Sequence, residues 1–407
     1  MEQTFDLVIV GGGAAGMVAG IEAKRINSAL SVALLEQEDR VGKKILVTGN
    51  GRCNLTNRSG LEGRYYGETQ FAQTAFQQFG VDDTLNWMET IGVSSVELEE
   101  GKMYPRSLQA GSVVDQLRFA LEESGITLIS SCCVTRIKKD KSFVLQTTQG
   151  EIFAKKVLVA TGGKSGLKAG QKANGYDLLK GLGHESTPLY PAIVQITTEK
   201  NPIRPLKGIK VDGIITANNG REKRKEYGEI LFTEYGISGP PVLQVSALLS
   251  SAGGGMVELD LMPELTFKEI KEEIERRCSA FVNRTCEELL TGFMNKRLGQ
   301  TLIKLAGVEK LSRTCGSLTP KEISAIAGIA KKFSLQVDGT NGWQQAQVTG
   351  GGVKAKEFSP TTMESKKVKG LYVAGEVLNV TGDCGGFNLQ WAWTSGILAA
   401  RHMAKGE

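Results

Sequence analysis

The 407-residue chain has the composition of an ordinary soluble protein, with 41% hydrophobic residues, 23% charged residues and a formal net charge of +5. This modest charge gives little support for a polyanionic partner, and the lack of an apolar run of about 18 residues argues against a membrane span. The seven cysteines include no CxxC pair, which argues against a zinc site or a disulfide scaffold and predicts a cytoplasmic protein with reduced thiols.

The N-terminal residues carry a dinucleotide-binding pattern. Phe5–Val10 is an apolar run typical of a buried strand, the turn GGGAAG leads into a helix-like segment, and a second apolar run, Ser31–Leu35, ends at an acid. In such a turn the glycines permit a sharp bend, close approach to a pyrophosphate and tight helix–strand packing, while the acid accepts hydrogen bonds from ribose hydroxyls. The predicted dinucleotide contacts are Gly11, Gly13, Ala14, Ala15, Gly16 and Glu36.

The segment Val41–Asn57, VGKKILVTGNGRCNLTN, combines glycines and amides in an irregular loop suited to wrapping a ligand. It resembles the signature loop of a bacterial family of NAD(P)/FAD-dependent oxidoreductases that includes aminoacetone oxidases and a flavoprotein linked to bile-acid dehydroxylation. In that family the loop lies along the flavin, so the resemblance implies FAD contacts for Lys44, Thr48, Asn50, Gly51, Arg52, Cys53 and Asn54. Two other roles are open for Cys53, a redox thiol or a buried side chain without chemistry. The second is favoured because no partner cysteine lies nearby in sequence.

Residues 71–123 have a largely helical pattern, interrupted by a loop at Gly101–Arg106. A similar Gly-Lys/Arg-x-x-Pro element lies near the active site in the family, which makes Tyr104 and Arg106 candidate neighbours of the substrate. The alternative is a surface turn whose arginine extends its aliphatic stem along the protein.

A β-meander is predicted from Gly125 to Ala154, where short apolar runs alternate with charged or glycine-containing turns. In single-Rossmann flavoproteins such a meander contacts the adenine through backbone groups, here near Val134. Lys156–Ala160 is predicted to form a further buried strand, and the sequence VLVATGG resembles the second FAD fingerprint of these proteins. The resemblance adds three candidate cofactor contacts, Thr161, Gly162 and Gly163.

The character of the chain changes between residues 191 and 347, which predicts an insertion into the nucleotide-binding domain. Residues 191–265 contain short β-like runs and are predicted to form a small β-domain, whose basic run at Arg221–Lys225 is interpreted as a solvated turn. Within it, LFTEYGISGP resembles another family element, but Glu234 stands where most members for comparison have histidine. The role of this position therefore stays open.

Residues 266–347 are predicted to form an inserted helical module. Three Thr-x-x-Glu sequences fit capping boxes at helix starts, at Thr266, Thr285 and Thr319. No catalytic signature occurs in this module, so it is interpreted as a lid or packing element.

The chain re-enters the nucleotide-binding domain at residues 348–353 and ends with LYVAGEVLNVTGDCGGFNLQWAWTSG, from Leu371 to Gly396. A strand is predicted to lead through an acidic, glycine-rich loop into a helix that points its N–H groups at a ligand. By resemblance, the acid at 383 meets the ribityl or phosphate region, and the helix start faces the pyrimidine edge of the flavin. The predicted contacts are Gly375, Glu376, Asp383, Gly386, Asn388 and Leu389.

Together these patterns predict an α/β protein with a Rossmann-like FAD-binding domain of the single-Rossmann, glutathione-reductase-like type, formed by residues 1–190 and 348–407. The predicted function is FAD-dependent oxidoreduction, with hydride transfer between flavin and a small or medium organic substrate and with NAD(P)H or oxygen as the second redox partner. An RNA-modifying flavoprotein and a non-catalytic redox sensor are the alternatives. Neither His184 nor His402 is expected to act as a general base, no nucleic-acid or membrane partner is expected, and neither a catalytic residue nor an oligomeric state follows from the sequence.

Overall fold

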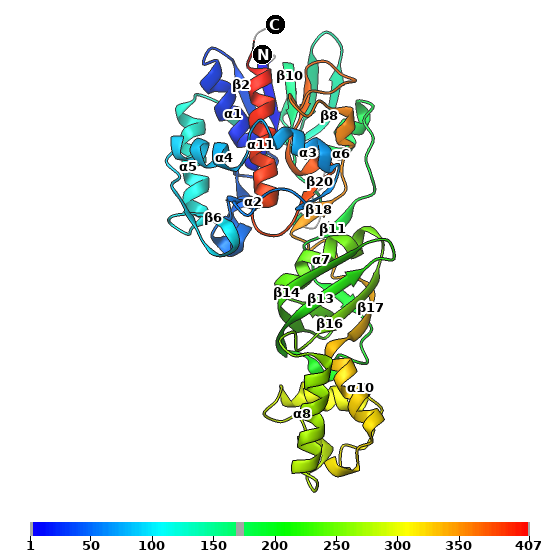
Figure 1. The fold of residues 1–407 in the computed structure, drawn as a ribbon. Helices are drawn as coiled ribbons and strands as arrows, with labels where there is room; N and C mark the ends of the chain where they lie inside the picture. The colour runs from blue at the N-terminus through cyan, green and yellow to red at the C-terminus, as the bar shows by residue number, and fades with distance from the viewer. Residues whose placement is uncertain (1–2, 168–174, 406–407) are drawn as a thin grey trace. The chain divides into compact units, whose positions relative to one another are not determined.

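The structure, a computed structural model, describes residues 3–167 and 175–405. The chain divides into two compact units, the first formed by Met1–Tyr190 with Val348–Glu407 and the second by Pro191–Gln347. Each unit has its own hydrophobic core. Figure 1 shows the second unit as the green to light-orange part of the chain, so the first unit is built from both ends of the sequence.

A seven-stranded sheet forms the centre of the first unit, in the order β7-β2-β1-β10-β9-β8, with β19 also paired to β10. The strands β7, β2, β1, β10 and β19 run parallel to their neighbours, whereas β9 and β8 continue the sheet antiparallel from β10. The apolar runs Leu7–Val10 and Val32–Leu35 are buried, as expected in a parallel sheet covered on both faces. The strands are β1 (Gln3–Val10), β2 (Val32–Leu35), β7 (Thr127–Ile129), β8 (Val134–Lys139), β9 (Phe143–Thr147), β10 (Gly150–Val159) and β19 (Leu371–Val373).

Two strand predictions in this sheet need correction. Thr127–Ile129 belongs to the parallel sheet beside β2, so the meander consists of β8, β9 and β10 alone. The two separate strands predicted after residue 150 are one ten-residue strand, β10, because its first half pairs with β9 and its second half with β19. Pairing on both edges keeps the strand continuous across the charged pair Lys155-Lys156.

The helix α11 packs closely on α1 in the first unit (Figure 1). A Cβ atom at Gly396 would lie 2.4 Å from the Ala15 carbonyl oxygen, so glycine is required for this approach. The helices of the unit are α1 (Ala14–Ile26), α2 (Lys43–Leu46), α3 (Thr69–Phe76), α4 (Val81–Thr90), α5 (Ala110–Glu123), α6 (Gly175–Gly181) and α11 (Phe387–Met403). Short strands complete it: β3 (Thr56–Asn57), β4 (Tyr65–Gly67), β5 (Ser95–Glu97), β6 (Lys102–Pro105), β18 (Val348–Gly350) and β20 (Val380–Gly382). The short strand β11 (Tyr190–Ala192) contains the last residue of this unit's first segment and the first two residues of the second unit.

The second unit contains a closed barrel in the order β12-β15-β14-β13-β16-β17. Alternate residues of its long strands point into a buried interior, for example Ile215 with Ala217 and Ile230 with Phe232. One helix, α7 (Pro240–Ser251), packs on β14 inside the range predicted to be β-structure. The strands are β12 (Ile196–Thr198), β13 (Lys210–Asn218), β14 (Lys223–Phe232), β15 (Gly236–Ser238), β16 (Gly255–Asp260) and β17 (Phe333–Thr340).

The helical segment of the second unit lies between β16 and β17 and consists of α8 (Phe267–Ala280), α9 (Lys296–Leu305) and α10 (Pro320–Lys331). The predicted helical range 266–347 extended too far, because β17 pairs with β16 and β12 and closes the barrel. The capping boxes at Thr266 and Thr319 are confirmed. The one at Thr285 is wrong, since only a single 3-10 turn follows and its side chain makes no cap bond.

Among the described helices, none has both the length and the hydropathy needed to cross a bilayer.

Candidate functional site

In the glycine-rich turn between β1 and α1, some glycines are packed against other atoms of the protein and one faces open space. Gly11 has a φ of +110°, and a Cβ atom there would lie 2.4 Å from the Ala160 carbonyl oxygen of the neighbouring strand. A Cβ atom at Gly16 would lie 1.9 Å from the Gly11 carbonyl oxygen, whereas one at Gly13 would have no atom within 4 Å. Gly11 and Gly16 are therefore needed for packing. Gly13 leaves room for a group above the start of α1, where Ala14 and Ala15 begin the helix.

Glu36 lies directly after β2 and binds the same turn. Its carboxylate accepts hydrogen bonds from the backbone N–H of Gly12 at 2.7 Å and of Glu38 at 2.8 Å. Burial raises the pKa of this carboxyl group, although the backbone donors oppose the shift. Two donors leave part of its acceptor capacity for further groups, such as the hydroxyls of a sugar.

The loop from residue 41 to 57 has a run of left-handed backbone conformations, with φ of 57° at Gly49, 55° at Asn50, 80° at Gly51 and 60° at Cys53. The Cys53 N–H donates to the Thr48 carbonyl oxygen at 3.0 Å and closes the bend. Left-handed residues other than glycine are strained, so a sequence of them indicates a loop held in a special shape. The bend leaves Asn50, Gly51 and Arg52 exposed and turns the next two residues inward.

Cys53 is buried in the core of the first unit. Burial raises the pKa of its thiol to about 12, despite the Thr48 hydroxyl nearby, so the thiolate required for redox chemistry does not form near neutral pH. Of the two interpretations of Cys53, a redox thiol and a buried side chain without chemistry, the structure favours the second.

Lys44 connects the loop to the end of β19. Its ammonium group forms an ion pair of 2.6 Å with Glu376, which also accepts from the Thr349 N–H at 2.8 Å and the Ser165 hydroxyl at 3.2 Å. Burial alone would raise the pKa of Glu376, but Lys44 and these hydrogen bonds lower it overall. The carboxylate thus stays ionised and ties together segments from both ends of the chain. Gly375, directly before it, accepts the Trp391 indole N–H and donates to the Ser395 hydroxyl.

The second fingerprint, Thr161-Gly162-Gly163, follows β10 at the edge of this network. Gly162 has a φ of +71°, and a Cβ atom at Gly163 would lie 2.4 Å from the Thr349 hydroxyl oxygen. The Thr161 hydroxyl lies against Gly175 at the start of α6. Val134, the predicted adenine neighbour, is buried at the start of β8, where the pairing with β9 has a bulge.

The loop before α11 is held by the side chain of Asn388 in the first turn of the helix and by an ion pair of 3.6 Å between Asp383 and Arg64. The Asn388 amide donates to the carbonyl oxygens of Gly382 at 2.7 Å and Asp383 at 3.2 Å, and its oxygen accepts from the Gly382 N–H at 2.8 Å. Asp383 is buried, and its N–H donates to the Arg64 carbonyl oxygen at 2.9 Å. Leu389 packs on the core. Asn388 is therefore a loop-ordering residue, and α11 begins one residue earlier than predicted, at Phe387.

The reason predicted for a glycine at position 386, close approach of the flavin, is wrong. Gly386 has a φ of +100°, and a Cβ atom would lie 2.7 Å from the Thr56 carbonyl oxygen and 2.8 Å from Asn54 Oδ1. Glycine is therefore needed here because the start of α11 approaches the segment of Asn54 and Thr56 closely.

The element at Gly101–Arg106 lies beside the loop of residues 41–57. The Arg52 guanidinium lies 5.0 Å from the centroid of the Tyr104 ring, within the range of a cation–π contact. Tyr104 is buried, whereas Arg106 is exposed. Glu234, the departure from the family pattern, is an exposed residue of the second unit that pairs with Lys207 at 2.5 Å.

Similarity to known proteins identifies the family. A family model described as the HI0933-like protein Rossmann domain matches residues 5–402. The chain belongs to this family. It is 37% identical over 404 residues to the 3-dehydro-bile acid delta(4,6)-reductase of Clostridium scindens, with 98% of each chain covered. It is 32% identical over 410 residues to the ribosomal RNA dihydrouridine synthase of Escherichia coli, with 98% of each chain covered.

The likeness also extends to a solved structure, the E. coli quinol fumarate reductase, with a TM-score of 0.51 and 17% identity over 99% of this chain and 70% of that chain. At this identity the likeness shows the fold alone. Family membership confirms the Rossmann-type FAD-binding fold and the oxidoreductase class that the sequence predicts.

Two buried oxygen atoms test whether the site fits FAD. Asn54 Oδ1 and Thr161 Oγ1 have no hydrogen-bond partner among the described residues. Asn54 Oδ1 lies beside Gly386 at the start of α11, and Thr161 follows the strand that adjoins Gly11. Because buried polar groups are rarely left without a partner, these atoms favour a polar ligand along the line from the β1–α1 turn to α11. The residues present therefore fit a dinucleotide.

Sequence reasoning missed several residues of this network. Thr349 lies in the glycine-rich run of residues 348–353 where the chain re-enters the domain and was identifiable from it, but Ser165 has no motif of its own. Arg64 and Tyr65 support the loop before α11, since the Tyr65 hydroxyl donates to the Phe387 carbonyl oxygen at 2.9 Å. Nothing in their local sequence distinguishes them.

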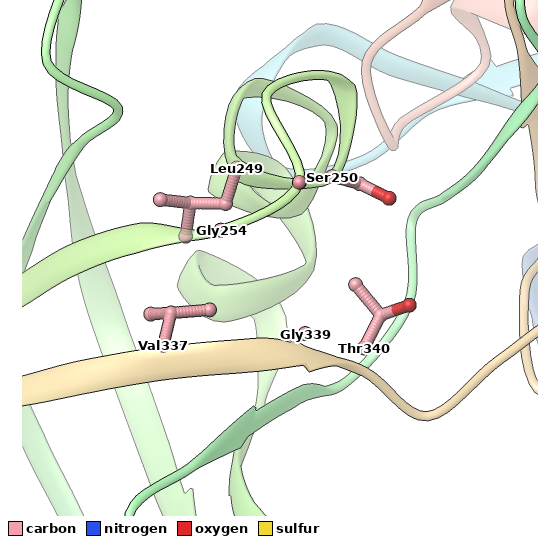
Figure 2. A pocket seen from close by; sticks show the side chains of 7 residues that line it. Leu249, Ser250, Gly254, Val337, Gly339 and Thr340 are labelled. Carbon is pink, nitrogen blue, oxygen red and sulfur yellow. The ribbon is translucent and has the colours of Figure 1, made fainter.

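A separate cavity of about 170 Å³ in the second unit lies between the end of α7 and β17. Figure 2 shows that Leu249, Val337 and Thr340 line it, and no ionisable side chain does. It is smaller than typical ligand sites, and its only polar side chains are the hydroxyls of Ser250 and Thr340, so it is not the candidate site.

Proposed function

We propose that this protein is an FAD-dependent reductase that adds hydrogen to a C=C bond conjugated with a carbonyl group. The observation that carries the proposal is its full-length similarity to a bile-acid reductase and to ribosomal RNA dihydrouridine synthases. Both names describe the saturation of a C=C bond: the first in an oxo-steroid, the second in the uracil ring. The two substrates differ greatly in size but share a double bond made electron-poor by a carbonyl.

The geometry of the first unit supports the proposed cofactor contacts. The N–H groups at the start of α1 would bind the pyrophosphate, with Gly13 leaving the space for it, and Glu36 would accept from the ribose hydroxyls. Residues 44–54 and the loop 375–389 would border the ribityl chain and the flavin. The Lys44–Glu376 ion pair would hold these two segments at a fixed separation.

FAD, when bound, supplies the hydride chemistry, and the protein supplies binding and orientation. The start of α11 would direct its free N–H groups and its positive dipole end toward the cofactor, which favours negative charge there. Tyr104, held under Arg52, would border the space next to the loop of residues 41–57. Because a reductase needs a source of electrons, NADH or NADPH is the proposed donor, and oxygen would be a competing acceptor.

A ribosomal RNA substrate is the second candidate. Two relatives named ribosomal RNA dihydrouridine synthase match at 32% and 30% identity over almost the entire chain, including the inserted unit. In the described part of the chain, five exposed cations of the α9–α10 region form no ion pair, which suits contact with phosphates. They are Lys296, Arg297, Lys304, Lys310 and Lys321. The non-catalytic sensor is not proposed, because the family is one of oxidoreductases.

The test is an anaerobic titration followed by visible spectroscopy. We expect purified, FAD-loaded protein to bleach with NADH or NADPH, and the yellow colour to return on addition of either a 3-oxo-Δ4 steroid or an RNA rich in uridine. The compound that restores the colour identifies the substrate class, and product analysis by mass spectrometry would show a gain of two hydrogens. A protein that cannot be loaded with FAD, or a reduced flavin that only oxygen reoxidises, would refute the proposal.

A further inference from the structure

An open groove of about 700 Å³ lies in the first unit, away from the glycine-rich turn. It is bordered by β8, α6 and residues 367–369, and β8 and α6 lie next to each other in Figure 1. Residues 367–369 precede β19, whereas Gly375 follows it, so the groove adjoins the opposite end of this strand from the candidate cofactor site. The groove is thus a distinct feature of the same unit.

The groove is strongly basic. Five cations line it, together with a single carboxylate, Asp177. They come from segments far apart in sequence and are Arg136, Lys138, Lys139, Lys367 and Lys369. Because like charges repel, their convergence around one hollow lowers stability wherever neither a carboxylate of the protein nor a bound anion offsets it.

Internal partners account for only part of this charge. Lys367 pairs with Glu357 at 2.8 Å, and the Lys139 ammonium lies 4.2 Å from the centroid of the Phe143 ring. Arg136 and Lys138 are exposed and form no ion pair with any described residue. Lysines on an edge strand also prevent association with other sheets. That explanation covers β8, and Lys369 interacts within the protein, as Lys367 does with Glu357. The positive charge of the groove that remains open to a ligand therefore comes from Arg136 and Lys138.

The shape and chemistry of the groove favour an extended anion. Its cations are exposed side chains spread over two segments, without a buried set of donors to enclose one phosphate group. Such an arrangement suits a chain of phosphates, in which each neutralised phosphate releases counterions and adds to affinity. We propose that this groove binds the phosphate backbone of an RNA substrate. The inference rests on the RNA candidate described above.

The experiment compares two double charge reversals in the full-length, FAD-loaded protein. Arg136→Glu with Lys138→Glu alters the groove, and Lys223→Glu with Lys225→Glu is the matched control, because these residues are also exposed cations two positions apart on one strand. Binding of a fluorescein-labelled oligouridine RNA is measured by anisotropy at several KCl concentrations. We expect the groove variant to bind at least about tenfold more weakly, with a salt slope smaller by about 1.4, as for two lost contacts to single-stranded RNA. The control should change affinity by less than about twofold.

Several outcomes separate the groove from the function. Equal weakening by both double variants would show general charge attraction and overturn the inference. Wild-type protein that reduces a steroid enone but binds no RNA would refute the RNA candidate and the groove together. If the groove variant reduces uridine in RNA as well as the wild type does, the proposed function stands and only the proposal that the groove binds RNA is refuted. Flavin absorbance and thermal unfolding check folding, and Lys138→Gln provides a milder variant with the same expected direction.

Discussion

Thr161 offers a direct test of the cofactor position, because its hydroxyl oxygen has no hydrogen-bond partner among the described residues. We predict that Thr161→Val has opposite effects on the apoprotein and on FAD binding. A buried unsatisfied polar group costs about 1–3 kcal/mol, so the nearly isosteric valine should raise the unfolding free energy of the apoprotein by up to this amount. If FAD supplies the missing partner, its loss should weaken FAD binding by about 0.5–1.5 kcal/mol, or roughly two- to tenfold in Kd.

The assay combines urea unfolding of flavin-free protein with fluorescence titration of FAD. Thr56→Val is the matched control, since the Thr56 hydroxyl already donates to the buried Gln390 side chain at 2.5 Å. This control should destabilise the apoprotein, because it leaves the Gln390 oxygen without its donor. Unchanged FAD affinity in Thr161→Val, together with an apoprotein no more stable than wild type, would show that the flavin has been assigned to the wrong place.

Three further predictions concern stability and reactivity. Burial lowers the pKa of His184, despite its contact with Glu357, so the unfolded chain takes up a proton at a higher pH, about 6.5, than the folded protein does. Between the unfolded-state and folded-state pKa of His184, the unfolding free energy should fall with decreasing pH by up to about 1.4 kcal/mol per pH unit, and urea unfolding of His184→Gln should lack this component. Cys53→Ala should keep the wild-type rate of flavin reduction, and mass spectrometry should find Cys53 unmodified by iodoacetamide in the folded protein at pH 8, since its thiol has a pKa of about 12. Labelling there would contradict the buried thiol. Gly396→Val should force α11 away from Ala15, lower the unfolding free energy by about 1–3 kcal/mol and reduce FAD retention, and unchanged thermal unfolding would contradict the close packing of α1 and α11.

The buried histidine illustrates how local sequence misleads. His184 follows Gly183 after a helical run, which predicts a helix-capping role, and its backbone N–H does donate to the Leu179 carbonyl oxygen at 3.0 Å. Its side chain, however, bonds Glu357 at 2.7 Å and Ser365 at 3.0 Å and stacks on Phe358. These partners lie more than 170 positions away in the chain, so no local pattern indicates them.

The same limit explains the errors in the inserted unit. The alternating pattern of Phe333–Thr340 is that of a strand, but it follows a long helical segment and was included in the helical module. Only pairing with β16 and β12 reveals that it closes the barrel. The apolar run in α7 is equally compatible with a buried strand or a buried helix until its packing is known.

The sequence by itself determined the parts of this protein whose physics is local. The order strand, glycine-rich turn, helix and acid requires only short-range backbone geometry, so it predicts the β1–α1 turn and Glu36. The signature loop predicts the family in the same way.

Tertiary structure decided which partners the predicted residues have. Glu376 meets Lys44 from the other end of the chain, Gly386 makes room for the Thr56 carbonyl, and Asn388 orders its own loop. The first two of these contacts form only when the two ends of the sequence come together in one unit. The residue type fixes the chemistry of a side chain, but the fold determines which residue that side chain contacts.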